Sequence, residues 1–184
     1  MPVSAIAAAM PVDPDVDELH HLVECARGGD RAAFADLYRR YSRVIHGILL
    51  SRVPRIEVED LVQEVFLAAL QQLPALRESA AFGGWLAAIA RNRATDYLRR
   101  APRMTELPPD LASSDADRTE AVFVLRVIQA LPDAYRETLT LRLVEGMTGP
   151  EIAALTGLTE GSVRVNLHRG MKQLREHLSE RRPL

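Results

Sequence analysis

The chain has 184 residues, of which 47% are hydrophobic and 26% charged, and its formal net charge is −2. This length predicts one or two domains with apolar cores, and no apolar run approaches the length of a membrane span, so we expect no membrane insertion. Cys25 is the only cysteine, which excludes an intramolecular disulfide and cysteine-based zinc sites.

The small net charge hides two basic patches, each of which follows an acidic stretch. Six acids lie between positions 13 and 30, five arginines lie between 91 and 103, and five acids follow between 104 and 120. The last predicted helix is basic again. The charge distribution is therefore compatible with nucleic-acid binding, although the net charge alone argues against it.

Residues 1–17 lack the basic start of a signal peptide, and we expect a disordered tail there. A helix over 18–27 ends at Gly28, and Asp30 caps the next helix, which stops before Pro54. Apolar residues of this second helix recur three and four apart and predict a core-facing stripe, namely Phe34, Leu37, Tyr38, Tyr41, Ile45, Ile48 and Leu49.

A third helix is predicted over 57–73, with a wide apolar face made by Leu61, Val62, Val65, Phe66, Ala69 and Leu73. The opposite side gathers Asp60, Gln63, Glu64, Leu67 and Gln71. A leucine among acids and amides favours a partner surface. Single exposed leucines are also ordinary on soluble proteins, so a solvated face is the alternative.

A loop is predicted over 73–84, and Ser79 or a neighbour is expected to start the next helix. This helix runs to about residue 100 with an outward stripe of Trp85, Ala88, Asn92, Thr95 and Arg99. Aromatic rings and guanidinium groups stack on unpaired bases, and arginines hold phosphates. The alternative for Trp85 is a core position at the helix start. Arg93 falls near the apolar face, where it is expected to snorkel or to pair with an acid.

Residues 101–117 contain three prolines and two serines without apolar periodicity, which is typical of a linker. A helix over 118–131 follows, with Ala121, Leu125 and Ile128 predicted to face inward. Pro132 opens a further helix that passes through Leu139 and Leu143 toward Gly146.

The segment 148–178 predicts two helices that meet at a glycine. Thr148 and Glu151 match a capping box, Gly157 suits the left-handed residue that ends a helix, and Thr159 is the next N-cap. The second helix buries Val163, Leu167, Met171, Leu174 and Leu178. This is a helix-turn-helix pattern, whose second helix enters the major groove of DNA in many proteins. A helical pair with a merely solvated charged face is the alternative.

No glycine-rich phosphate loop, metal-ligand cluster or nucleophile constellation is present in the sequence, and the five histidines lack zinc-site spacing. We therefore expect a protein that is not an enzyme and that needs no cofactor or metal.

Three blocks carry a family resemblance: EDLVQEVFLAAL at 59–70, FGGWLAAIARNRATDYLRR at 82–100, and the segment 131–175. Over residues 18–180 the chain resembles bacterial extracytoplasmic-function sigma factors of the sigma-70 family, which are promoter-specificity subunits of RNA polymerase. The resemblance implies an all-α fold with a region 2 domain at 18–100, an acidic linker at 101–117 and a region 4 helix-turn-helix domain at 118–180. It also implies a cytoplasmic protein associated with the nucleoid.

The resemblance further implies a role for each block. Contacts with the clamp helices of the largest subunit of core RNA polymerase fall on Asp60, Gln63, Glu64 and Leu67. Recognition and melting of the −10 element fall on Trp85, Arg91, Asn92, Asp96, Arg99 and Arg100. Recognition of the −35 element falls on Thr159, Ser162, Arg164, Val165, His168, Arg169 and Lys172. The helix-turn-helix domain is also expected on the flap of the second-largest subunit, and an anti-sigma factor is the usual further partner.

The chain departs from the family pattern at several positions. Ala68 and Leu70 stand where an arginine and an aromatic residue are usual, and Gly149-Pro150 replaces Tyr-Glu. Val165-Asn166 replaces Ser-Arg, and valine cannot hydrogen-bond a base edge. The promoter sequence that relatives recognise therefore cannot be assigned to this chain. Gly170 replaces a usual alanine and is expected to weaken its helix by about 1 kcal/mol.

Promoter-directed initiation is thus the function that the sequence predicts. A free-standing helix-turn-helix regulator would need neither the stripe at 60–71 nor the block at 82–100. A helical scaffold that sequesters a protein would have no use for the outward arginine, asparagine and tryptophan of that block.

Overall fold

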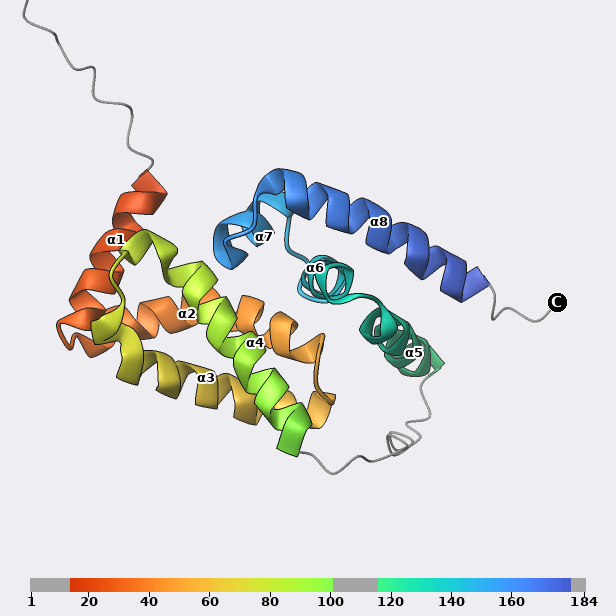
Figure 1. The fold of residues 1–184 in the computed structure, drawn as a ribbon, viewed down its shortest axis with the longest axis horizontal. Helices are drawn as coiled ribbons and strands as arrows, with labels where there is room; N and C mark the ends of the chain where they lie inside the picture. Colours follow the sequence, from red (N-terminus) through yellow and green to blue (C-terminus); the bar gives the residue numbers. More distant parts are fainter. Residues whose placement is uncertain (1–13, 101–115, 180–184) are drawn as a thin grey trace, which may run out of the picture.

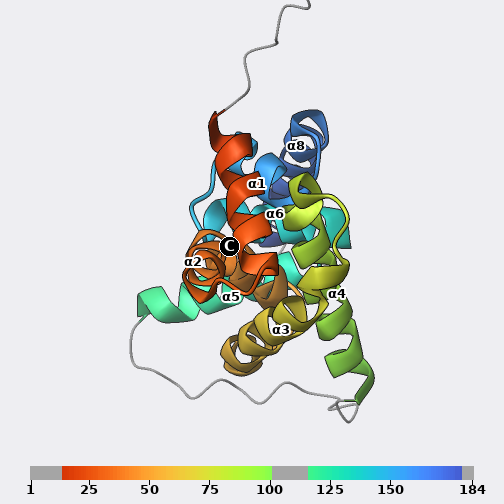
Figure 2. The same cartoon turned by 90° about the vertical axis from the view of Figure 1, so that its left-hand side faces the viewer.

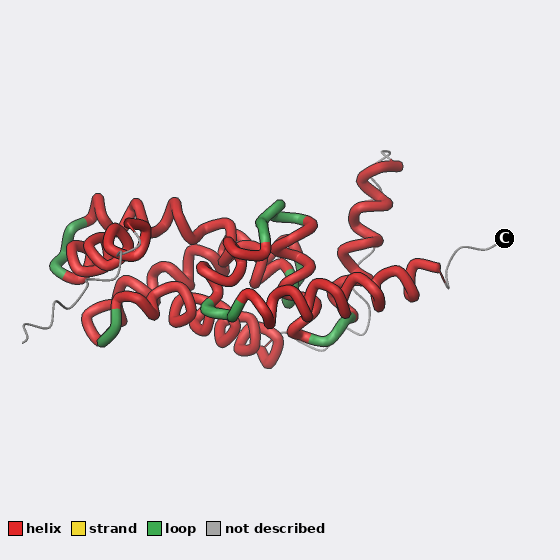
Figure 3. The backbone as a smooth tube through the Cα atoms, turned by 90° about the horizontal axis from the view of Figure 1, so that it is seen from above, coloured by secondary structure: helices red, strands yellow, loops and turns green. Residues whose placement is uncertain are grey.

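The computed structural model describes residues 14–100 and 116–179, and in these two ranges every regular element is a helix (Figures 1 and 3). The predicted all-α fold is therefore confirmed. Most of the tail expected at 1–17 and most of the linker expected at 101–117 lie outside the described residues. The tail was predicted too long, because the first helix already begins at Pro14 and includes residues 14–17.

The N-terminal helices, residues 14–100, are α1 (Pro14–Arg27), α2 (Arg31–Leu50), α3 (Val58–Gln72) and α4 (Phe82–Arg100). The Asp30 carboxylate accepts the backbone N–H groups of Ala32 and Ala33 and so caps α2. The inward faces of α2, α3 and α4 meet in one core, in which Leu37, Val65 and Leu86 are fully buried. The apolar periodicity of these helices therefore identified their buried sides correctly.

The segment between α3 and α4 differs from the expected loop. It contains two short 3₁₀ turns, Leu73–Ala75 and Ser79–Ala81, and α4 already begins at Phe82. Two side chains of α1 hold these turns: Arg27 Nη1 donates to the Leu76 carbonyl at 2.8 Å, and Glu24 accepts the Ser79 hydroxyl. The Ser79 hydrogen bond is also the main reason why the pKa of Glu24 lies below its ordinary value.

The C-terminal helices, residues 116–179, are α5 (Ala116–Ala130), α6 (Asp133–Leu143), α7 (Gly149–Thr156) and α8 (Glu160–Ser179). A small cluster of Ile128, Leu131, Leu139 and Leu174 joins α5, α6 and α8. A larger buried cluster includes Leu141, Ile152 and Val163 together with the core of the N-terminal helices. The apolar core is therefore continuous between the two sets of helices.

Helix α6 lies in the middle of the molecule and packs on both α2 and α8 (Figures 1 and 2). Because it is covered from two sides, its polar side chains are buried: Glu137 is 5% exposed and Thr140 is inaccessible. The Thr140 hydroxyl keeps a hydrogen bond despite its burial, because it donates to the Arg136 carbonyl one turn earlier, at 2.9 Å.

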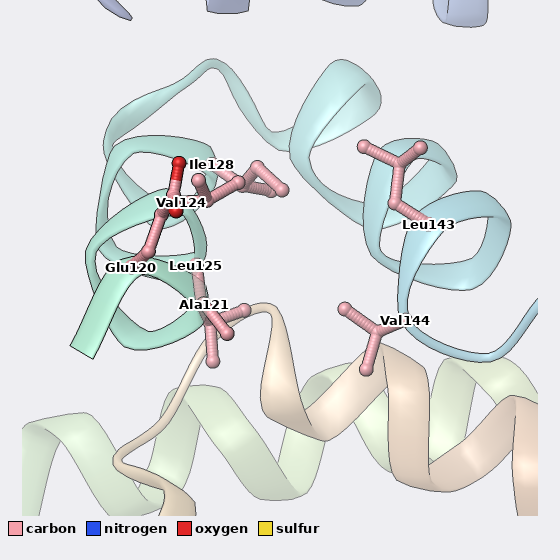
Figure 4. A pocket seen from close by; sticks show the side chains of 7 residues that line it. All are labelled: Glu120, Ala121, Val124, Leu125, Ile128, Leu143 and Val144. Carbon is pink, nitrogen blue, oxygen red and sulfur yellow. The ribbon is translucent and has the colours of Figure 1, made fainter. Parts of the chain in front are cut away.

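Two residues expected in apolar stripes, Tyr38 and Ala121, face outward instead. Tyr38 is 40% exposed and lies on Phe66, with ring centroids 4.5 Å apart. Ala121 is exposed and Leu143 is 46% exposed. Both border a cavity of about 400 Å³ between α5 and the end of α6 (Figure 4), which is lined by Glu120, Ala121, Val124, Leu125, Ile128, Leu143 and Val144. The two helices diverge there, so nothing described covers these side chains.

Candidate partner and nucleic-acid interfaces

The outer face of α3 presents the residues predicted for a partner surface. Asp60, Gln63, Glu64 and Leu67 are all exposed, and Leu67 exposes 59% of its surface. Leu70, three residues further on, is 48% exposed. The remaining apolar residues of α3 are buried, so these two leucines form a distinct apolar site beside acids and amides.

Helix α4 presents only part of its predicted set to solvent. Asn92, Arg99 and Arg100 are exposed, and Arg99 Nη1 lies 3.9 Å from Asp96 Oδ1. Trp85 is half-buried against Phe82, with ring centroids 5.7 Å apart. The tryptophan therefore combines the two alternatives, a core contact and a surface position. Arg93 lies 3.9 Å from Glu64, as expected for a pairing with an acid.

Arg91 of α4 is bound to an acid of the C-terminal helices. Its Nη2 and Nε donate to the two carboxylate oxygens of Glu137 at 2.7 and 3.0 Å. This bidentate, charge-assisted geometry is the strong form of an arginine–carboxylate pair. The pKa of Arg91 is raised above its ordinary value because of the hydrogen bonds to Glu137.

The helix-turn-helix is built as the sequence predicts. Thr148 and Glu151 form a complete capping box at the start of α7, and Gly157 ends that helix with φ 74° and ψ 13°. The backbone N–H of Thr148 donates to Glu151 Oε2 at 2.6 Å, and this bond holds the pKa of Glu151 below its ordinary value. The left-handed conformation at Gly157 is the reason why this turn favours glycine.

Helix α8 carries the predicted DNA-facing residues on its exposed side. Arg164, Val165, His168, Arg169 and Lys172 are all exposed, and Val165 exposes 46% of its surface. Thr159 Oγ1 accepts the backbone N–H of Ser162 at 3.1 Å and lies 2.8 Å from the Ser162 hydroxyl. The Thr159 hydroxyl therefore caps the start of α8, as predicted.

The buried side of α8 approaches α6 closely at Gly170. A Cβ atom at this position would lie 3.0 Å from Tyr135 Cβ and 3.0 Å from Leu139 Cδ1. The helix-weakening glycine noted in the sequence therefore allows two helices to pack at short distance.

Comparison with known proteins now decides the family. A model of sigma-70 region 2 matches residues 37–104, and a model of sigma-70 region 4 matches residues 124–174. The RNA polymerase sigma factor CarQ of Myxococcus xanthus is 34% identical over 86% of this chain and 96% of its own length. The chain belongs to the extracytoplasmic-function group of the sigma-70 family.

Further comparisons agree with that family. The extracytoplasmic-function sigma-E factor of Escherichia coli K12 is 33% identical over 83% of this chain and 90% of its own length. A solved structure of CnrH in complex with the cytosolic domain of CnrY is 26% identical, with a TM-score of 0.64 over 90% of this chain and 100% of that chain. The chain is thus a sigma factor, which directs transcription initiation, and its family is not a family of enzymes.

The structure of this sigma factor also shows ion-pairing residues that the sequence did not indicate. Glu137 also accepts from Nη2 of Arg52, which lies in the turn after α2, at 3.2 Å, and Arg52 Nη1 donates to Asp133 at 2.8 Å. Hydrogen bonding to Arg52 is the main reason why the pKa of Asp133 is lowered. These partners are separated by 81 and 85 positions in the chain, so no local pattern could reveal them.

A second ionic contact joins α2 to Glu145, two positions after the end of α6. Glu145 Oε1 lies 2.6 Å from His46 Nδ1, and the Glu145 carbonyl accepts from Arg43. The hydrogen bond to Glu145 raises the pKa of His46 above its ordinary value of 6.5. His46 was expected to be structural or a surface residue, and this contact is consistent with that expectation.

The described residues show neither a metal site nor a membrane-spanning helix. They contain no group of histidine, cysteine, aspartate and glutamate that could hold a metal ion. None of their helices is long and apolar enough to cross a bilayer.

Proposed function

We propose that this sigma factor binds core RNA polymerase through the outer face of α3 and contacts the −10 and −35 elements through α4 and α8. The observation that carries the proposal is the face of α3, where Leu67 and Leu70 stay exposed although every other apolar residue of the helix is buried. Exposed leucines flanked by polar groups are the composition expected of a protein–protein contact.

The proposal for DNA rests on the character of α4 and α8. The arginines of α4 suit the negative charge of phosphates, and Asn92 can hydrogen-bond unpaired bases. The exposed side of α8 follows a turn of the helix-turn-helix type and carries Arg164 in its first turns, where such helices reach base edges. In this assignment residues 18–100 act as region 2 and residues 118–180 as region 4.

Further partners follow by similarity. CnrH has been solved with the cytosolic domain of CnrY, and we infer that this sigma factor likewise has a protein partner that regulates it, in the manner of an anti-sigma factor. The same proposal includes contact of α8 with the flap of the second-largest polymerase subunit. It also places the protein in the bacterial cytoplasm, at the nucleoid.

The test of the polymerase face uses gel filtration with purified core RNA polymerase. A variant with Asp60→Ala and Glu64→Lys is expected to lose co-elution with core enzyme while its circular dichroism stays unchanged. Glu18→Lys, a charge reversal at an exposed position of α1, is the control and should co-elute normally. If the double variant forms holoenzyme normally, the assignment of α3 is wrong. A native chain that binds operator DNA without any affinity for core enzyme would instead be a free-standing regulator.

A further inference from the structure

We propose that Val165 reads the methyl group of a thymine in the −35 element and so helps to determine which promoters this sigma factor selects. The inference rests on the proposed contact of α8 with the −35 element, and it names the chemical group that the helix recognises there. Val165 is the only exposed apolar side chain in the described residues of α8. Thymine is the base that presents an apolar group, its C5-methyl, in the major groove of DNA.

Val165 lies in the middle of the exposed side of α8. The buried residues of this helix are Val163, Gly170 and Leu174. At about 100° per residue, Val165 points almost directly away from the mean direction of these three. Lys172, which is also exposed, lies two turns further along the same line. A duplex that docks on this side of the helix therefore meets Val165 at the centre of the contact and not at its edge.

The surroundings of Val165 suit the approach of a base edge. Arg164 and Arg169 are exposed on either side of the line through Val165 and Lys172, where their charges attract the phosphates of DNA. Gly161, one turn before Val165, leaves open space, because a Cβ atom there would meet only Thr159 Oγ1, at 3.9 Å. The methyl groups of the valine are therefore framed by cations and unobstructed on the side of the helix start.

Nothing in the fold requires a valine at this position. Val165 exposes 46% of its surface and belongs to neither apolar cluster of the protein. Valine is also a weaker helix former than alanine, lysine or arginine, so helix propensity does not favour it on an exposed face. The residue therefore lowers the stability of α8 slightly without a packing gain in return, which is the pattern expected of a side chain that serves a contact.

The chemistry of valine selects one group among those in the major groove. The side chain cannot donate or accept a hydrogen bond, whereas guanine, adenine and cytosine are distinguished there by their donors and acceptors. Its branch at Cβ leaves one strongly preferred rotamer in a helix, so the two methyl groups are held in fixed directions. Contact with the thymine methyl therefore orders little that is not already ordered. Burial of one methyl-sized group corresponds to a factor of about four in affinity.

The test compares thymine with uracil, which differs from it only by lacking the C5-methyl group. Native holoenzyme first selects its preferred −35 element from promoter DNA in which that region is randomised. Each thymine of the selected element, on either strand, is then replaced singly by uracil, and the affinity of the closed complex is measured by competition. We expect uracil at one position to weaken binding about fourfold.

Three variants assign the effect to a side chain. Val165→Ala removes both γ-methyl groups and favours the helix, so its holoenzyme should bind the thymine and uracil templates equally. Val165→Ile retains a branched apolar side chain and should retain the preference for thymine. Val144→Ala is the matched control, because Val144 at the end of α6 exposes 48% of its surface, close to the 46% of Val165. This control should keep the native preference.

The outcomes separate the reading of a methyl group from the proposed function. If native holoenzyme shows no base preference in the randomised region, the proposed role of α8 is refuted, and the inference with it. If an element is selected but no uracil template binds more weakly than its thymine counterpart, the methyl contact is refuted while −35 recognition stands. If Val165→Ala prefers thymine over uracil as strongly as the native protein does, another residue reads the methyl and the assignment to Val165 is wrong.

Discussion

Replacing Gly170 by alanine tests whether packing or helix propensity decides the stability of α8. Alanine is the better helix former by about 1 kcal/mol, so the propensity of the isolated helix favours the variant. The structure argues the opposite. The new methyl group would lie 3.0 Å from Tyr135 Cβ and 3.0 Å from Leu139 Cδ1, closer than ordinary van der Waals contact.

The expected magnitude follows from which atoms must move. The Tyr135 Cβ is attached to the backbone of α6, and Leu139 is fully buried, so neither can shift without disturbing the packed helix. Overpacking of this kind costs about 1–3 kcal/mol. After subtraction of the propensity gain we expect Gly170→Ala to lower the free energy of unfolding by about 1 kcal/mol, or the melting temperature by about 2–4 °C.

Urea unfolding followed by far-ultraviolet circular dichroism measures the difference. Gly161→Ala is the matched control on the same helix, because a Cβ there would meet only Thr159 Oγ1, at 3.9 Å. The control should be as stable as the native protein or more stable by up to about 1 kcal/mol. A Gly170→Ala variant that matches or exceeds the native stability, with the control behaving as expected, would show that α6 can move away from α8 freely.

Three further predictions concern single side chains. In holoenzyme, Arg164→Ala should reduce discrimination between the correct and a scrambled −35 sequence by about 1–3 kcal/mol. Lys172→Ala should weaken binding to both sequences equally and lower the salt dependence of binding by about one unit of slope. If Arg164→Ala weakens binding to both sequences equally, Arg164 does not read the bases. Asn92→Ala should spare the closed promoter complex and reduce the permanganate reactivity of thymines, and normal reactivity would exclude Asn92 from strand opening. Glu145 raises the pKa of His46 in the folded protein above the ordinary value of 6.5. The pair therefore contributes its full stabilisation below pH 6.5, and this contribution is lost as the pH rises through the pKa of the folded protein. The stability difference between native protein and His46→Gln should shrink over that window, and a constant difference from about pH 5 to 8 would show that the pair does not titrate there.

Local signals in the sequence account for most of the helices and for the helix-turn-helix. Apolar spacing identified the buried sides of α3 and α8, and the pair Thr148 and Glu151 located the start of α7. Each of these features depends on residues within a few positions of one another. The exposure of the predicted interface on α3, including Leu67, follows from the same periodicity and agrees with the structure.

The contacts between the N-terminal and C-terminal helices could not be predicted in this way. Periodicity assigns one inner and one outer face to a helix, but α6 is covered on two sides and has no free polar face. For that reason Glu137 and Thr140 are buried although both are polar. The capture of Arg91 depends on how two sets of helices pack, which no spacing within either set encodes.

A Cβ atom on Gly84 of α4 would lie 3.7 Å from Gly157 Cα, and this close approach limits how freely the halves of this protein can be exchanged with those of relatives. Gly157 is needed locally by its turn, whereas Gly84 lies inside a helix that alanine would favour by about 1 kcal/mol. A chimaera that takes residues 1–100 from a relative with a long side chain at this position would fold in both halves and still lose their mutual fit. Such a chimaera should therefore show looser packing between residues 1–100 and 116–179 than the native protein.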